Sequence, residues 1–580
     1  MFARFARLLR DVWALTRPYW FSDERWSARG LLFLIIVLNL GIVFLNVLFN
    51  DWNRRFFNAL QTFDEADFVP LLIRFTVLAL IFIAVGVYRL YLRQMLQMRW
   101  RRWMTEQYVG RWLDQRTYYR LQLEGSTTDN PDQRITEDLR DFTQNTLILG
   151  VGIMESVVTL VSFAAILWNV SGAITLPLFG MAITIPGYML WAAVLYCGIG
   201  TWLTHLIGRP LIPLQFERQR VEADYRFNLV RFRENVESVA LYGGEAREKR
   251  AFVDRFTRIM ANWWLIMKRT KQLTGFTFSF GQVATIFPLV MAAPRYFAHQ
   301  IELGQLTQIA DAFSQVQSAL SWFVDNYSGL AEWKATVDRL TSFTAAMTRV
   351  EEANQAAAIT VQPAAGRDIA VRELDLGLPG GSLLMQHAAL TLHPGEPTLL
   401  SGPSGSGKST LFRAIAGIWP YGAGTVERPP SARLLFLPQK PYLPIGSLRE
   451  VLSYPQAIDG TTDDMMIAAL RACELPNLVD RLDERQHWAQ SLSPGEQQRI
   501  AFARALLAKP DWLFLDEASS ALDEVLETRL YEMLPERLPN TTVISIGHRP
   551  SLRAFHKRHV ELRLADGAWG LHDLALRAAQ

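Results

Sequence analysis

Cysteine is almost absent from this chain. Two cysteines occur among 580 residues, Cys197 and Cys473, and they stand far apart in segments of different character. A disulfide framework needs several cysteines, and a zinc site built on cysteine needs ligand pairs a few residues apart. The sequence therefore excludes a disulfide-stapled scaffold and a cysteine-based metal centre.

Charge of one sign and targeting signals are scarce as well. The 59 Lys and Arg nearly balance the 56 Asp and Glu, which leaves a formal net charge of +3. The arginines do not gather in a basic tail and no nucleic-acid-binding motif occurs, so we expect no nucleic acid among the partners. The first twenty residues lack the apolar core and the small-residue cleavage site of a signal peptide.

Long hydrophobic segments, in contrast, are plentiful. Apolar residues make up 50% of the chain, with 33 Phe and 18 Trp, which is too apolar for an ordinary soluble protein. Six segments have the length and composition of membrane spans: 29–49, 69–92, 146–168, 186–207, 276–297 and 305–330. The last two carry polar residues, so a pair of buried soluble helices is the alternative there.

Positive charges predict how these spans are oriented. Arginine and lysine crowd the leading segment, the link between the second and third spans, and the link between the fourth and fifth. The other links are short and poorer in positive charge, so we expect both termini to be cytoplasmic. Arginines alternate with apolar residues over 5–16, which predicts a helix lying on the inner leaflet.

The length of the chain predicts more than one domain. We divide it into an N-terminal interfacial segment, a membrane domain with six spans and long cytoplasmic helical extensions, a linker and a C-terminal domain. Their expected bounds are 1–28, 29–350, 351–368 and 369–580.

A glycine-rich segment in the C-terminal domain has the spacing of a phosphate-binding loop. Its residues are Gly402, Pro403, Ser404, Gly405, Ser406, Gly407, Lys408, Ser409 and Thr410. The segment follows a strand-like run and leads into an expected helix. Its glycines let the backbone approach a phosphate, whose charge the helix N-terminus favours. We expect Lys408 to reach the outer phosphates and Ser409 to ligate Mg²⁺.

Residues that suit nucleotide hydrolysis follow this loop. The apolar run 512–515 ends in Asp516 and Glu517. Asp516 would hold Mg²⁺ through water, and Glu517 would polarise the attacking water. Gln439 and His548 each come just after another apolar run. A surface amide, a loop histidine and a helix cap are the plainer alternatives, but the whole set in this order favours a nucleotide site.

These residues, in this order, resemble the ATP-binding cassette of ABC transporters. The resemblance implies an α/β P-loop NTPase cassette behind an α-helical, six-span, exporter-like membrane domain, with ATP and Mg²⁺ as cofactors. It implies that Gln439 joins Mg²⁺ and water to the membrane domain, that His548 senses the γ-phosphate, and that Asp523 is the acid of the D-loop. It also implies a homodimer, in which Ser493 and Gly495 contact the γ-phosphate of ATP held by the partner subunit.

Two positions depart from the pattern of this family. Pro494 stands where glycine is usual, which removes one backbone N–H from the signature turn. The aromatic residue that usually stacks on adenine is missing from the segment 374–381. We therefore expect the phosphate contacts of Ser493 and Gly495 to persist, with loose selectivity for the nucleobase.

The membrane half narrows the resemblance. Segments 21–26 and 50–61 resemble the bacterial SbmA/BacA-related group, whose ATPase-bearing members, like the ABCD transporters, are also similar in the cassette. Segment 234–245 resembles the coupling region of the ABCD transporters, and 129–134 is a second candidate coupling element. Helix caps and turns are the alternative for both segments. The group implies a multi-pass protein of the bacterial inner membrane that imports peptides and cobalamin-like solutes.

Polar residues recur every three or four positions along the sixth span, which places them on one helical face. They are Gln308, Asp311, Gln315, Ser318, Trp322 and Asp325. Carboxylates inside a membrane segment usually face a wet cavity, so we expect a hydrophilic cargo chamber. Hydrogen bonding between helices is the alternative.

Other functions stay open at this point. Within transport, the alternatives are fatty-acyl or lipid movement of the ABCD type and non-specific export of several solutes. Outside transport, they are a soluble-type ATPase and a membrane protein with an inactive cassette. The six spans weigh against the soluble ATPase, and the complete nucleotide motifs weigh against the inactive cassette.

Overall fold

The computed structural model describes residues 2–123, 130–178, 181–355, 359–456, 460–565 and 568–574. The chain forms two compact units. The membrane unit consists of residues 1–110 and 130–344, and the cassette unit consists of residues 111–129 and 345–580. Each is described by itself.

Long helices dominate the membrane unit. A helix satisfies its backbone hydrogen bonds internally, as the interior of a bilayer demands. The helices are α1 (Phe2–Trp20), α2 (Arg25–Thr62), α3 (Glu65–Leu113), α5 (Pro131–Gln133), η2 (Arg134–Asp138), α6 (Leu139–Ser171), α7 (Tyr188–Gly208), α8 (Leu211–Glu234), α9 (Val236–Tyr242), α10 (Glu245–Phe297), α11 (Leu303–Asp325) and α12 (Tyr327–Gln355). The last residues of α3 and α12 belong to the cassette unit.

Five stretches among the described residues are long and apolar enough to cross a membrane, and they contain α2, α3, α6, α7 and α10. The predicted sixth span coincides with α11 and the start of α12, which meet at Asn326. Its polar stripe lowers its hydropathy and keeps it out of that set. The helical membrane domain with five to six apolar helices therefore agrees with the prediction.

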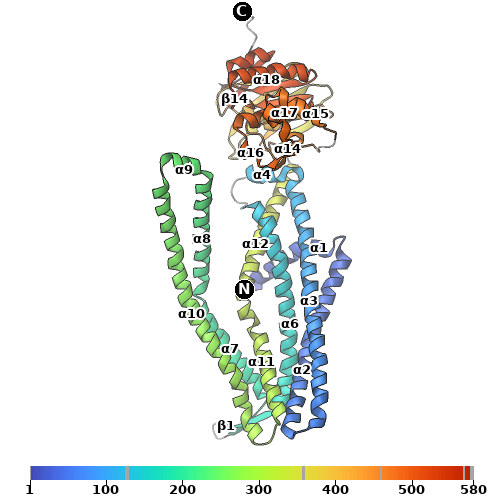
Figure 1. The fold of residues 1–580 in the computed structure, drawn as a ribbon, viewed down its shortest axis with the longest axis vertical. Helices are drawn as coiled ribbons and strands as arrows, with labels where there is room; N and C mark the ends of the chain where they lie inside the picture. The colour runs from blue at the N-terminus through green and yellow to red at the C-terminus, as the bar shows by residue number, and fades with distance from the viewer. Residues whose placement is uncertain are drawn as a thin grey trace, which may run out of the picture. The chain divides into compact units, whose positions relative to one another are not determined.

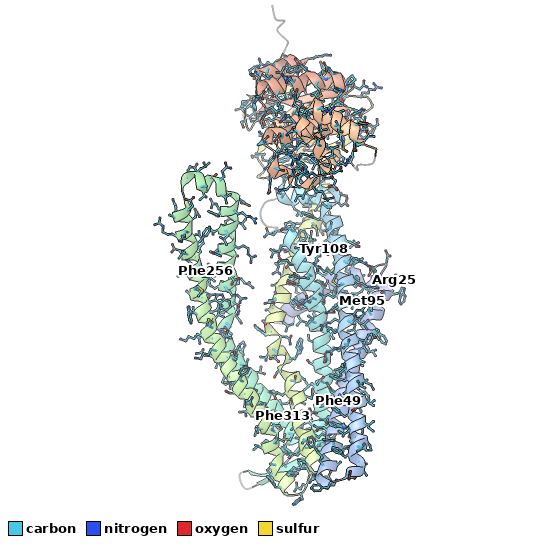
Figure 2. All side chains as sticks on the ribbon, viewed as in Figure 1. Arg25, Phe49, Met95, Tyr108, Phe256 and Phe313 are labelled. Carbon is cyan, nitrogen blue, oxygen red and sulfur yellow. The ribbon has the colours of Figure 1, made fainter. Side chains whose placement is uncertain are left out.

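Helices α8 and α10 lie side by side and are joined by α9 (Figure 1). The three helices together form a long arm. Gly243 ends α9 in the left-handed region, at φ 61°. Phe256 on this arm is 47% exposed, whereas Phe313 on α11 is fully buried among residues of α6, α7 and α10 (Figure 2). The arm therefore carries large apolar side chains that this chain leaves exposed.

The segment 50–61, which carried part of the resemblance, fastens α2 to the start of α11. Asn58 Oδ1 accepts from the backbone N–H of Gly304 at 2.8 Å, and Gln61 Oε1 accepts from the N–H of Leu303 at 2.7 Å. A Cβ on Gly304 would overlap a backbone oxygen of α2. Glycine at this position therefore lets the two helices approach closely enough for the amides to bond.

Two connections contain strands that the sequence analysis did not predict. The short link before the fourth span is an antiparallel hairpin of β1 (Ala173–Leu178) and β2 (Met181–Pro186), rich in the Ile and Thr that suit strands. The linker expected at 351–368 contains β3 (Ile359–Pro363), which pairs in parallel with β7 (Gly422–Arg428). Composition suggested a linker because Ala, Pro and Gly flank this short strand.

A ten-stranded sheet forms the centre of the cassette unit, in the order β3-β7-β4-β5-β14-β13-β6-β12-β11-β8. Its remaining strands are β4 (Ile369–Gly377), β5 (Leu383–Leu392), β6 (Thr398–Ser401), β8 (Leu434–Leu437), β11 (Trp512–Asp516), β12 (Thr542–Ile546), β13 (Arg558–Ala565) and β14 (Ala568–Leu574). Strands β6, β12, β11 and β8 are parallel neighbours. Their carboxyl ends therefore meet at one edge, where ligands bind in sheets of this kind.

Helices and short strands surround this sheet. They are η1 (Asp114–Arg116), α4 (Thr117–Leu123), α13 (Lys408–Ile415), β9 (Gly446–Ser447), α14 (Leu448–Ser453), α15 (Asp463–Ala472), η3 (Pro476–Arg481), β10 (Arg485–Gln486), α16 (Trp488–Ser491), α17 (Pro494–Ala508), α18 (Glu524–Arg537) and η4 (Pro550–Phe555). The α/β cassette at the C-terminal end of the chain agrees with the predicted fold.

The segment of η1 and α4 packs on the cassette core. Arg116 Nη1 donates to Ala416 O at 3.2 Å and to Gly417 O at 3.4 Å. These carbonyls follow the end of α13, where a cation is a favourable partner. Leu123 packs against the apolar cluster of the sheet. The expected coupling element at 129–134 begins at a position outside the described residues, and these cassette contacts come from upstream of it.

Candidate functional site

The phosphate-binding loop connects β6 to α13, as the sequence predicts. Gly402, Gly405 and Gly407 adopt φ values of 147°, 80° and 94°, which side chains disfavour. A Cβ on Gly407 would lie 2.7 Å from Leu384 Cδ2. The loop therefore needs glycine both for its conformation and for its packing.

The donors of this loop fit a phosphate group. Ser406 is fully buried, and its hydroxyl has no hydrogen-bond partner in the described part of the chain. Lys408 Nζ donates to Gly402 O and Pro403 O, both at 2.8 Å. Burial lowers the pKa of Lys408, as desolvation disfavours its charged form. An anion at the loop would satisfy these donors.

Two of the three residues predicted to hold Mg²⁺ (Ser409, Asp516 and Gln439) are in direct contact. Ser409 Oγ donates to Asp516 Oδ1 at 2.8 Å, which joins the start of α13 to the end of β11. Burial raises the pKa of Asp516. A hydroxyl and a carboxylate oxygen are the hard ligands that Mg²⁺ prefers, so the donor set fits the ion.

Glu517 is the meeting point of the three residues predicted to be catalytic. Gln439 Nε2 donates to Glu517 Oε2 at 3.1 Å, and His548 Nε2 lies 3.3 Å from Glu517 Oε1. The three follow β8, β11 and β12, whose carboxyl ends are adjacent. Glu517 itself has φ 49°, a left-handed conformation that turns the chain sharply after β11.

Gln498 is a residue of this site that the sequence analysis did not single out. It is 3% exposed, and its Nε2 donates to Gln439 O at 2.9 Å and to Ser520 Oγ at 3.2 Å. Its Oε1 accepts from the N–H of Ala521 at 2.9 Å. It thereby ties the loop of Gln439 to the turn after Glu517. The pair of glutamines in the first two turns of α17, just before its apolar residues, was the available signal.

The signature residues begin α17. Ser493 Oγ accepts from the N–H of Glu496, whose carboxylate returns to Ser493 N at 3.0 Å, a capping box. Pro494 takes the first helical position, where its missing N–H has no partner to lose. A Cβ on Gly495 would lie 3.2 Å from Ala521 O. The departure at Pro494 is therefore accommodated by the helix start.

Asp523 caps the next helix. Its Oδ1 accepts from the N–H of Leu526 at 2.8 Å, and it precedes α18 directly. Arg549, also missed by the sequence analysis, donates to Leu522 O at 2.8 Å. Asp523 and Arg549 thus fix the turn that carries the expected D-loop.

The segment 374–381, which lacks an aromatic residue, forms the end of β4 and the turn after it. Trp419 Nε1 donates to Gly377 O at 3.0 Å, and Trp419 is itself buried. This indole therefore supports the segment from inside the unit.

The polar stripe of the sixth span does not act as one set. Gln308 and Asp311 bond across to α2: Asn50 Nδ2 donates to Asp311 Oδ2 at 2.6 Å, and Gln308 Nε2 donates to Asn50 Oδ1 at 3.1 Å. Interhelical bonding, the alternative noted above, thus describes these two. Of the others, Gln315 is half-buried and Ser318 and Asp325 are exposed.

Trp322 lines a cavity of about 210 Å³ inside the membrane unit. The other lining residues come from α2, α3 and α6 and from the junction of α11 with α12: Asn39, Arg89, Leu90, Arg93, Ile148, Val151, Gly152, Glu155 and Asn326. The sequence analysis missed the charged members of this set, because they lie on two helices, α3 and α6, that no spacing rule relates.

Two family models match the chain. One is described as "ABC transporter transmembrane region 2" and matches residues 15–297. The other is described as "ABC transporter" and matches residues 385–520. The first match covers most of the membrane unit, and the second covers the loop, the signature and the residues around Glu517.

The chain is similar to several curated proteins along most of its length. An uncharacterized ABC transporter ATP-binding protein of Haemophilus influenzae is 36% identical, over 98% of this chain and 94% of that protein. The inner membrane ABC transporter ATP-binding protein YddA of Escherichia coli is 33% identical, over 94% of this chain and 96% of that protein. The lysosomal cobalamin transporter ABCD4 of Mus musculus is 26% identical, over 83% and 82%.

The fold also has a solved counterpart. A structure described as that of a bacterial Atm1-family ABC exporter with ATP bound matches 95% of each chain with a TM-score of 0.69 and 18% identity. At this identity the likeness concerns the fold alone, with a helical membrane region followed by a cassette.

Proposed function

This chain belongs to the ABC transporter family, and on that basis we propose that it takes up hydrophilic solutes, such as peptides or cobalamin-like compounds, across the bacterial inner membrane. Its cassette is an ATPase that uses ATP with Mg²⁺ and couples hydrolysis to transport. It is a multi-pass membrane protein. The cargo and its direction are the proposed parts.

The contacts around Glu517 carry the chemical part of the proposal. Gln439 and His548 both contact its carboxylate. Glu517 directly follows Asp516, which is hydrogen-bonded to Ser409. We assign water polarisation to Glu517, and the orientation of its carboxylate to the other two. Lys408 and the loop amides would hold the phosphates, and Ser409 and Asp516 would hold Mg²⁺, which neutralises phosphate charge when bound.

We infer a homodimer from the number of nucleotide-binding motifs in one chain. One phosphate-binding loop and one signature occur per chain, and in this family each ATP lies between the loop of one subunit and the signature of the other. Ser493, Gly495 and Asp523 would then face the partner's nucleotide. A purified monomer with full ATPase activity would exclude this arrangement.

The proposed topology places both termini in the cytoplasm. Positions near Phe63 and Ala298 would face the periplasm, and the tip of the arm near Gly243 would face the cytoplasm. The other cytoplasmic marker, Gly125, lies outside the described residues. Gly243 needs its left-handed φ of 61°, so Tyr242→Cys, at an 88% exposed position, is the better probe. Labelling of that cysteine by an impermeant reagent in intact cells would contradict the proposed orientation, because it would place the tip of the arm outside the cytoplasm.

Transport itself is tested with purified protein in proteoliposomes. ATP should drive uptake of a labelled peptide or of cobalamin by the parental protein and not by Glu517→Gln. The sequence similarity to a cobalamin transporter of the ABCD type supports the choice of cargo. Absence of ATP-dependent movement of either solute would reject the proposed cargo.

Fatty-acyl transport is the second candidate, and one observation favours it. Two arginines line the membrane cavity, as an acyl carboxylate or phosphate would require. Stimulation of ATP hydrolysis by an acyl-CoA, with none by peptide or cobalamin, would put this candidate first.

A further inference from the structure

The cavity in the membrane unit has an ionic lining with a charge imbalance. Three charged side chains line it, Arg89, Arg93 and Glu155, beside the amides of Asn39 and Asn326. Two positive charges and one negative charge leave a net charge of +1. Charged side chains inside a membrane domain are costly unless they are paired or serve a ligand.

Arg89 and Glu155 satisfy each other. Arg89 Nη1 lies 3.0 Å from Glu155 Oε2, and the same nitrogen donates to Asn39 Oδ1 at 3.0 Å. The two charged side chains are about equally exposed, at 32% and 33%. This pair joins α3 to α6 and α2, and it adds no net charge to the cavity.

Arg93 is the unpaired member. It lies four residues after Arg89, on the same face of α3, and it is half-buried. No hydrogen bond or ion pair holds its guanidinium within the described residues. A guanidinium offers five donors that match the two oxygens of a carboxylate or phosphate.

The remaining wall is apolar and closely fitted. A Cβ on Gly152 would lie 2.9 Å from Trp322 Nε1, so glycine lets the indole lie against α6. Trp322 and Asn326 flank the break between α11 and α12. In membrane proteins, a helix break that lines a cavity is a common place for a solute.

We propose that this cavity binds the carboxylate or phosphate group of an organic solute, with Arg93 as its partner and Trp322 against the adjoining apolar part. At about 210 Å³, the cavity is smaller than the roughly 300–1,000 Å³ of pockets that enclose a whole drug-sized ligand. The cavity therefore takes the charged end of a larger solute. The inference deepens the proposed function, since a peptide C-terminus and an acyl carboxylate share this chemistry.

The test compares anions with neutral analogues. The full chain is placed in phosphatidylcholine nanodiscs, where no anionic lipid competes. Equilibrium binding is measured for labelled Ala-Ala-Phe and its C-terminal amide, and for labelled octanoate and octanamide. Each acid should bind about tenfold more tightly than its amide, a difference of about 1.4 kcal/mol. The tighter of the two acids identifies whether peptide or acyl solutes are favoured.

Variants locate the effect. Arg93→Gln should remove the preference for the acid, and Arg93→Lys should restore part of it because the charge is kept without the fork. Glu155→Gln should strengthen acid binding, since it removes the opposing negative charge. Gly152→Ala should weaken binding of acid and amide alike by pushing Trp322 into the cavity. Arg258→Gln, at an exposed position on α10, is the matched control and should leave the acid preference unchanged.

Each outcome separates this inference from the transport proposal. Equal binding of acid and amide, or no saturable binding of either acid, overturns the anion site even if ATP drives peptide uptake in proteoliposomes. Acid preference that Arg93→Gln abolishes supports the site even if neither peptide nor cobalamin is transported. Folding of each variant is verified by elution volume and thermal midpoint, and Arg93→Lys serves if Arg93→Gln does not fold.

Discussion

Two carboxylates, one in each unit, are held by partners from distant parts of the chain. Glu517 meets Gln439 and His548 where neighbouring parallel strands end. Glu155 meets Arg89 midway along two long helices. A sheet with fixed strand order decides which strand ends are neighbours, whereas a helical stripe specifies a face and leaves the partner helix and depth undetermined.

The two clusters also differ in how charge is balanced. In the cassette unit, Lys408 lies close to two acidic residues, Asp516 and Glu517. In the membrane unit, Arg89 and Glu155 cancel and Arg93 is left over. The first arrangement is complete once a nucleotide with Mg²⁺ is bound, and the second leaves one positive charge that the proposed anion would balance.

The largest expected effect tests the cassette side of this comparison. Glu517→Gln should lower ATP turnover by about 100-fold or more, because proton acceptance from water is lost, while ATP binding persists. Turnover and nucleotide affinity are measured on the same preparation. Glu524→Gln, an exposed acid at the start of α18, is the control. Near-parental turnover of Glu517→Gln would remove Glu517 from the catalytic role.

The cassette unit and the membrane unit also differ in how much of each could be predicted from the sequence. The phosphate-binding loop, Asp516, Glu517, Gln439 and His548 were predictable because each follows an apolar strand at a known spacing. Gln498 was missed, since one buried glutamine in a helix has no spacing partner.

In the membrane unit, the helices were predictable from hydropathy and their contacts were not. Gln308 and Asp311 share a stripe with Trp322, yet the first two bond to α2 and the third lines a cavity. The difference arises from how α11 packs against four other helices, α2, α6, α7 and α10, and one sequence does not specify that packing. The sequence analysis treated the segment between the third and fourth spans as a short link. The hairpin of β1 and β2 within that segment was therefore not predicted.

The second effect concerns acid stability of the cassette unit. His556 is buried between Leu552 O at 2.7 Å and Ser545 Oγ at 2.8 Å, and burial lowers its pKa from 6.5 to about 4. Stability from this residue is present above pH 6.5 and is lost as pH falls through about 4, because the unfolded chain binds the proton first. The shift is on the order of 3 kcal/mol.

Thermal unfolding between pH 7.5 and pH 4 measures this loss. His556→Gln should flatten the pH dependence of the midpoint for the cassette unit, and His572→Gln, at an exposed position, should not. An unchanged slope for His556→Gln would mean that other groups dominate the acid sensitivity.

The third effect tests the polar contacts of the membrane unit. Asn50→Ala removes the bonds to Asp311 and Gln308 and leaves both without that partner. Interhelical hydrogen bonds in membranes contribute about 0.6 to 1.7 kcal/mol, so the loss should be about 1 kcal/mol. Unfolding in mixed detergent micelles measures it, with Asn53→Ala as the control on the same helix. Equal stability of the two variants would make the α2–α11 contact energetically unimportant.

The smallest effect concerns the segment that precedes the undescribed residues 124–129. Arg116 is exposed and donates to Ala416 O and Gly417 O, so each bond should contribute about 0.5 kcal/mol, the low end for a net hydrogen bond. Arg116→Ala should leave basal ATP turnover within about twofold of the parent, because Arg116 contacts no described residue of the nucleotide site.

Stimulation of turnover by transported solute should fall further with Arg116→Ala, since the bonds join the segment of η1 and α4 to the end of α13, the helix that starts at Lys408. The matched control is Gln122→Ala, an exposed change in the same segment that should leave stimulation intact. If basal turnover and stimulation fell equally, Arg116 would support the fold of the cassette alone. A selective loss of stimulation would show that small contacts of this kind couple solute binding to ATP hydrolysis. Neither family motifs nor helical periodicity identifies such contacts.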